Sequence, residues 1–130
     1  MAAQFAPAAA FGNVAPDPDG NLWIAQDKFR ESFAQDLAED EAFAMAVTQK
    51  PAPGSTFGDA VTVAAWRTVP SWYQVSGHDR MINPEAQRWM AQRIGARHTL
   101  ELDAGHASLA TRARDVAGLV DEATAELVLY

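Results

Sequence analysis

Two short β-rich runs separated by a helical pattern restrict the folds open to this chain. The runs cover residues 71–75 and 98–102, and residues 84–94 between them have helical periodicity. The apolar residues at helical spacing are Ala86, Trp89, Met90 and Ile94. This order predicts a β-α-β unit, whose strands lie parallel and whose crossover is right-handed. We therefore expect an α/β fold built on a parallel pair of strands.

The helix between the runs carries its own start and stop signals. Asn83 suits the N-cap, Pro84 suits the first helical position, and Glu85 puts a negative charge in the first turn. Gly95 tolerates positive φ and is suited to end the helix. These signals support a helix over residues 84–94.

A residue capable of acid-base chemistry follows each run. Asp79 comes after the first run and His106 after the second. Paired parallel strands lie about 4.8 Å apart, so side chains at matching strand ends can reach hydrogen-bonding distance. The crevice beyond the carboxyl ends of such strands is where open α/β sheets bind ligands. Asp79 and His106 are the first catalytic candidates, and two polar residues in solvated loops are the alternative.

The N-terminal region lacks sustained periodicity. Residues 1–20 are rich in Ala, Pro, Gly and Asp, so we expect a flexible arm there. Residues 16–21, with the sequence PDPDGN, are typical of a turn. Residues 22–24 after the turn fit either an edge strand or simple packing.

A helical segment is expected between the arm and the β-α-β unit. Residues 21–65 hold two short amphipathic patterns, one with Asp27 as its N-cap and one over residues 39–49. Two such helices without strands predict a cap-like segment layered on another element. Residues 66–130 then form a C-terminal βαβα unit.

The sequence blocks that carry these features resemble a known family. PSWYQVSGHDRMINPEAQRWMAQRIGA and HTLELDAGHASLATRARDVAGLVDEA are similar to the C-terminal part of α/β-hydrolase-fold proteins, in particular small bacterial esterase-like members related to hydroxynitrile lyases and salicylate esterases. The resemblance implies that Asp79 is the acid and His106 the base of a catalytic triad. It also implies that residues 19–51 are the helical cap inserted before the last strands, and that the fold is a partial α/β-hydrolase fold.

The chain departs from that family at the nucleophile. The family's serine lies in a Gly-x-Ser-x-Gly elbow, and these 130 residues contain no such motif. In the nearest sequence, residues 54–58, the serine comes one position too early. Ser76 and Ser108 lie near the crevice but lack a strained elbow. We therefore expect a fragment of a carboxylic ester hydrolase that is inactive alone. A non-catalytic binding or assembly module that reuses the half fold is the alternative.

A two-stranded parallel sheet leaves edges open to another chain. Hydrophobic residues make up 48% of the sequence, a surplus over what this small architecture can bury. We expect self-association or a complementary N-terminal half, with a small-molecule ester as substrate once the fold is complete.

Charge and composition exclude other classes of partner and chemistry. The net charge of −7 opposes binding to nucleic acid, and we expect no signal peptide, no membrane span and a cytoplasmic protein. The absence of cysteine removes thiolate catalysis and disulfides. A metal site is a further hypothesis, since imidazoles and carboxylates bind metal ions, and its candidate ligands are His78, Asp79, His98, Asp103 and His106. His98, however, should begin the second strand, at the opposite end from the loops, which leaves too few converging ligands. We expect no cofactor and no metal.

Overall fold

Strands β4 and β5 form the parallel pair that the sequence predicts. In the computed structural model, which describes residues 4–128, β4 spans Tyr73–Ser76 and β5 spans Thr99–Leu102. They run parallel, with Tyr73 opposite Thr99 and Ser76 opposite Leu102. Val75 at the centre of β4 is fully buried. The expected α/β architecture is therefore confirmed.

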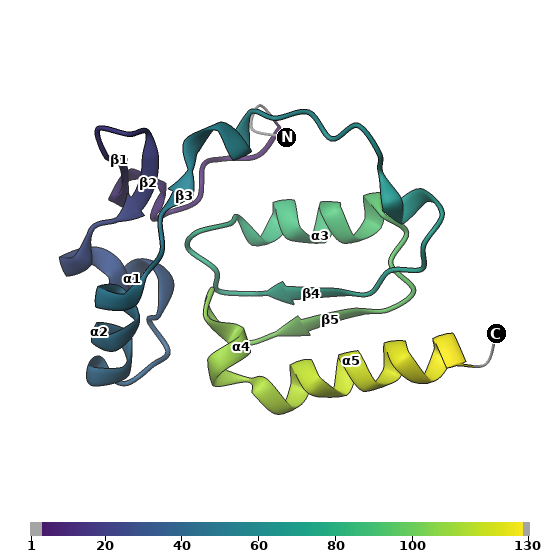
Figure 1. Cartoon of the computed structure of the whole chain (residues 1–130). Coiled ribbons are helices and arrows are strands. Elements are labelled where there is room, and N and C mark those ends of the chain that lie inside the picture. The colour runs from purple at the N-terminus through teal and green to yellow at the C-terminus, as the bar shows by residue number, and fades with distance from the viewer. Residues whose placement is uncertain (1–3, 129–130) are drawn as a thin grey trace.

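Helices cover both sides of this pair. Helix α3 (Pro84–Arg93) makes the crossover, while α4 (Ser108–Thr111) and α5 (Ala113–Val128) follow β5. Figure 1 shows α3 on one side of the two strands and α5 on the other. The Asn83 side chain caps α3 by accepting a hydrogen bond from Glu85 N at 2.8 Å, and Gly95 ends it with φ of +62°. The helix thus begins and ends where the start and stop signals of the sequence predict.

A three-stranded antiparallel sheet occupies the region expected to hold a flexible arm, two helices and at most an edge strand at residues 22–24. It contains β1 (Val14–Pro16), β2 (Asn21–Ile24) and β3 (Ala52–Pro53), with β2 in the centre. The turn between β1 and β2 explains the difference. Asp17 Oδ1 accepts hydrogen bonds from Asp19 N and Asn21 N, and Gly20 adopts φ of +82°.

The Asp17 carboxylate also binds the indole of Trp23 in β2. Asp17 Oδ2 accepts a hydrogen bond from Trp23 Nε1 at 2.9 Å. Residues 22–24 thus belong to a central strand and not to an edge strand. The turn residues order the end of the expected arm, because their side chains bond to the strand that follows.

The first helix between β2 and β3 is shorter than the sequence suggests. A 3₁₀ turn, η2 (Gln26–Lys28), precedes α1 (Phe29–Phe33), and neither has a side-chain cap, so the N-cap role expected for Asp27 was wrong. Helix α2 (Glu39–Thr48) matches its expected range. The remaining 3₁₀ turns are η1 (Phe11–Asn13), η3 (Gly54–Phe57) and η4 (Ala65–Arg67).

One small core joins this N-terminal part to the loop after β5. Its buried members are Phe29, Ala34, Ala42, Ala46 and Ala107. Ala107 follows His106 directly, and its amide donates to Phe33 O at 3.1 Å. In Figure 1 the strand arrows of β4 and β5 point toward α1 and α2, so the N-terminal part lies beyond the carboxyl ends of the parallel pair.

The parallel pair has no further strand among residues 4–128. β4 pairs with β5, and the antiparallel sheet is separate from both. None of the helices described is both long and apolar enough to cross a bilayer. The open edge keeps self-association or a complementary half as an expectation.

Candidate active site

Asp79 lies in the turn that follows β4. Its amide donates to Ser76 O at 3.2 Å, and its Oδ1 accepts from the amides of Met81 at 2.7 Å and Ile82 at 3.0 Å. The side chain is only 3% exposed. These bonds leave Oδ2 to interact with groups from other elements.

His106 lies in the loop that follows β5, beside that carboxylate. Gly77 N donates to Leu102 O at 2.8 Å, so the strand pairing continues to the point where both loops begin. Nδ1 of His106 then lies 2.9 Å from Oδ2 of Asp79. The structure thus brings both catalytic candidates into hydrogen-bonding contact, and their catalytic role stays a prediction.

The surroundings of Asp79 favour its ionised form. Burial opposes ionisation, but the hydrogen bonds from His106 and from the Ile82 and Met81 amides outweigh it and lower the pKa of Asp79. An ionised carboxylate at this position accepts a hydrogen bond from Nδ1–H, which leaves Nε2 as the basic nitrogen of the neutral imidazole. This pair can therefore present a proton acceptor on its free side.

The N-terminal part packs directly on the histidine. The rings of Phe33 and His106 meet edge to face, with centroids 4.5 Å apart and planes at 64°. Asp36 accepts a hydrogen bond from Gly105 N, and Gln35 Nε2 donates to His78 O at 2.8 Å. The segment after α1 thus bonds to both loops, the one after β4 and the one after β5.

Gly105 leaves room for the close approach of the Gln35 side chain. A Cβ at residue 105 would lie 2.6 to 2.7 Å from the end atoms of the Gln35 side chain. A larger residue would displace Gln35 and its hydrogen bond to His78. The glycine before the histidine therefore allows the N-terminal part to sit against the loop.

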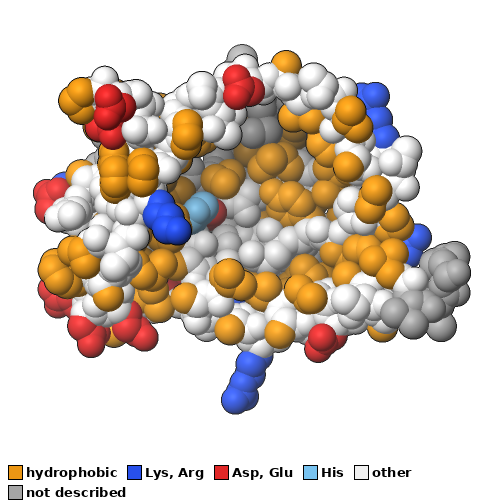
Figure 2. Space-filling model, in the orientation of Figure 1, with side chains coloured by type: hydrophobic (Ala, Val, Ile, Leu, Met, Phe, Trp, Pro, Cys, Tyr) orange, Lys and Arg blue, Asp and Glu red, His pale blue; other side chains and the backbone are white. Residues whose placement is uncertain are grey.

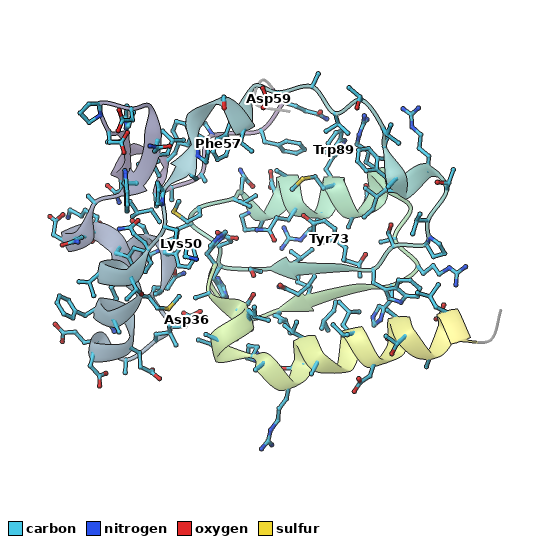
Figure 3. All side chains as sticks on the ribbon, viewed as in Figure 1. Asp36, Lys50, Phe57, Asp59, Tyr73 and Trp89 are labelled. Carbon is cyan, nitrogen blue, oxygen red and sulfur yellow. The ribbon has the colours of Figure 1, made fainter. Side chains whose placement is uncertain are left out.

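A cavity of about 520 Å³ opens beside His106. Its lining is mainly apolar and includes Trp23, Phe29, Phe33, Met45, Phe57 and Met81. Lys50 also lines the cavity, and it comes, like Phe57, from the segment after α2. Both residues are labelled in Figure 3. Apolar side chains border the hollowed face of the molecule in Figure 2. A ligand with an apolar body would fit next to the imidazole.

Neither serine considered as a nucleophile is placed to react. Ser76 Oγ donates to Ser108 Oγ at 3.0 Å, and Ser108 Oγ donates to Gln74 Oε1 at 3.0 Å. Both serines are only 4% exposed. Among the hydrogen bonds of residues 4–128, none joins a serine hydroxyl to His106. These hydroxyls belong to a buried hydrogen-bond network between β4 and the start of α4, and neither bonds to the imidazole.

The other two histidines contact different carboxylates. His78 Nε2 lies 2.6 Å from Asp103 Oδ1 on the exposed surface. His98 precedes β5, at the other end of the strand, and its Nδ1 lies 2.7 Å from Glu122 Oε2. In the described part of the chain, no three His, Asp or Glu side chains converge in a way that could hold a metal ion.

The sequence reading missed Gln87. Its side chain is buried at the start of α3, and Nε2 donates to Asp79 Oδ2 at 2.8 Å. The one available signal is its place on the buried face of the helix, next to Ala86.

The parallel strand pair with its flanking helices belongs to a known class of fold. The family model of the alpha/beta hydrolase family matches residues 1–119, and the chain belongs to that family. The recognition of a partial α/β-hydrolase fold from the two sequence blocks is therefore confirmed.

Solved structures of two esterases share the fold. The chain is similar to polyneuridine aldehyde esterase, with 15% identity and a TM-score of 0.67 over 85% of this chain and 47% of that one. A mutant of that esterase gives 14% identity and a TM-score of 0.66, over 83% of this chain and 46% of that one. A methylesterase from Arabidopsis gives 16% identity and a TM-score of 0.61, over 88% and 55%.

The chain thus spans about half the length of these esterases. A search of curated proteins finds no match. At these identities the structural likeness defines the fold alone.

Proposed function

We propose that this chain supplies the acid and the base of a carboxylic ester hydrolase. Asp79 fixes the orientation and tautomer of His106, and His106 takes the proton of a serine hydroxyl and passes it to the leaving alcohol. The observation that carries the proposal is the 2.9 Å contact between His106 Nδ1 and Asp79 Oδ2 at the carboxyl ends of neighbouring parallel strands.

The nucleophile comes from a segment outside these 130 residues. The sequence has no Gly-x-Ser-x-Gly elbow, and the esterases of the same fold are about twice as long as the region they share with this chain. The open edge of β4 offers a place for the strand that would bring the elbow close to His106. On this proposal the chain alone has a base but no hydroxyl for it to activate.

The cavity beside His106 indicates the class of substrate. Aromatic and aliphatic side chains line most of it, so the acyl or alcohol part of the ester that enters is apolar. A chromogenic ester with a medium-length acyl chain is the appropriate first substrate.

Complementation tests the proposal. The chain is mixed or co-expressed with the N-terminal half of an α/β-hydrolase that carries the serine elbow, and formation of a folded complex is verified by light scattering. Turnover of the chromogenic ester should appear in the complex and be absent from either half. His106→Ala in the same complex should abolish it.

Two results would oppose the proposal. Enzyme-like hydrolysis by the isolated chain would show that the nucleophile is already present. A folded complex with tight apolar-ligand binding but no turnover, in which His106→Ala changes nothing, would favour the non-catalytic binding module.

A further inference from the structure

The Gln87 side chain bridges three groups at the base of the site. Its Oε1 accepts from Ser76 N at 3.0 Å, and its Nε2 donates to Asp79 Oδ2 at 2.8 Å and to Ile82 O at 3.1 Å. The residue is 4% exposed, so water does not readily replace these bonds.

The partners fix the orientation of the amide and require an amide at this place. Ser76 N can only donate, whereas the Asp79 carboxylate and the Ile82 carbonyl can only accept. A carboxylate side chain would lack the donor, and an ammonium would lack the acceptor. A glutamine is the side chain of this length that satisfies all three.

The Ser76 amide faces away from β5, which explains why it needs such a partner. Tyr73 N and Gly77 N both donate to the β5 side, at His98 O and Leu102 O. Amides alternate in direction along a strand, so that of residue 76 points to the open edge. Gln87 ties this rigid strand end to the carboxylate three residues later.

The two oxygens of Asp79 are held differently. Oδ1 is held by the amides of its own turn, from Met81 and Ile82. Oδ2 receives both the His106 imidazole and the Gln87 amide. Without the Gln87 amide, the His106 imidazole would be the only described group outside the turn that bonds to Asp79 Oδ2.

We propose that Gln87 is a positioning residue of the acid-base pair, whose amide keeps Asp79 Oδ2 directed at Nδ1 of His106. It acts through Asp79 and does not touch the reacting atoms. Its consequence for catalysis rests on the proposed esterase function, but its effect on the pair is measurable in this chain without any turnover.

The test is NMR on the isolated chain, with two variants at residue 87 and one control. The ring nitrogens of His106 report the tautomer, and the side-chain carboxyl carbon of Asp79 reports its titration. Gln87→Met removes donor and acceptor. Gln87→Glu keeps the length and the acceptor for Ser76 N but removes the donor. Gln74→Met removes an amide that bonds to Ser76 and Ser108 and not to Asp79.

In the wild type, neutral His106 should be protonated at Nδ1. Gln87→Met should turn this into a mixture of tautomers and raise the pKa of Asp79, because the carboxylate loses a donor. In Gln87→Glu, the two facing carboxyls should titrate as a coupled pair, with one apparent pKa above that of Asp79 in the wild type. Gln74→Met should leave tautomer and titration unchanged.

If Gln87 had only a structural role, its replacement would lower stability without changing the His106 tautomer or the Asp79 titration. A folded variant at residue 87 with the wild-type tautomer and the wild-type Asp79 titration would overturn the proposal. The wild type offers an independent check: the Nε2 protons of Gln87 should exchange with water more slowly than those of the exposed Gln92 on the same helix. Equal exchange would also overturn it. Failure of the complemented complex to hydrolyse esters would leave these readings intact and count only against the proposed function.

Discussion

The imidazole Nδ1 of His106 lies 2.9 Å from Oδ2 of Asp79, across 27 residues of chain. The contact arises because β4 and β5 are neighbouring parallel strands whose loops begin at the same level. The carboxylate is almost fully buried, while the imidazole remains one quarter exposed beside an apolar cavity. The buried member of the pair orients the accessible one.

Asp79→Asn should lower the free energy of unfolding at pH 7 by about 1–3 kcal/mol. The new amide retains an acceptor for the turn, but its NH₂ then faces two donors, Gln87 Nε2 and His106 Nδ1. Urea unfolding measures the loss. Asp103→Asn is the matched control, because its pairing with His78 is highly exposed and should change stability by less than about 0.5 kcal/mol. Equal losses in both variants would contradict the account.

The stability of the chain should depend on Asp79 in acid. The pKa of this carboxyl is lowered in the folded state, so its contribution is present above its unfolded pKa and is lost as pH falls through the lower folded value. Urea unfolding at pH 7 and pH 3 should show a smaller difference for Asp79→Asn than for the wild type. Asp17 and Glu101 also have lowered pKa values and keep some dependence in the variant. An unchanged pH dependence in Asp79→Asn would be inconsistent with this mechanism.

Phe33→Leu should cost about 0.5–1.5 kcal/mol of stability, since it keeps apolar bulk but removes the ring contacts with His106 and Phe29. Phe43→Leu, on the neighbouring helix, is the control. Phe43 is 67% exposed, and its replacement should change stability by less than about 0.5 kcal/mol. A loss in the control as large as in Phe33→Leu would show that the ring contacts are not responsible.

Gly105→Ala should cost about 1 kcal/mol, because the added Cβ displaces Gln35 and breaks its hydrogen bond to His78 O. In a Gln35→Ala background the same change should cost almost nothing, and the double-mutant cycle measures this coupling. Gly118→Ala in α5 meets no atom within 4 Å and should stabilise the chain slightly. Additive losses at residues 35 and 105 would disprove the steric link.

The β-α-β unit could be predicted from the sequence because its signals are local. Helical spacing, the Asn83-Pro84 start and the Gly95 end are each readable within a few residues. Parallel pairing then follows from topology, and it puts Asp79 and His106 at the same edge. No contact beyond neighbouring strands is needed for this inference.

The antiparallel sheet and the supports of the site could not be predicted in the same way. Its strands are two to four residues long, too short to display alternation. Gln87 and Gln35 are polar residues on short helical or turn segments, where a solvated position is the ordinary expectation. Their roles depend on contacts 8 and 43 residues away in the chain, which only the folded arrangement defines.

The most direct measurement of the central claim is serine labelling in a complemented complex. A complementary half with the Gly-x-Ser-x-Gly elbow is combined with this chain, and a fluorophosphonate probe reports whether its serine is activated. The account predicts rapid labelling of that serine in the folded complex and a loss of about 10⁴-fold or more with His106→Ala. Equal labelling with and without the His106 imidazole, in a complex verified as folded, would contradict it.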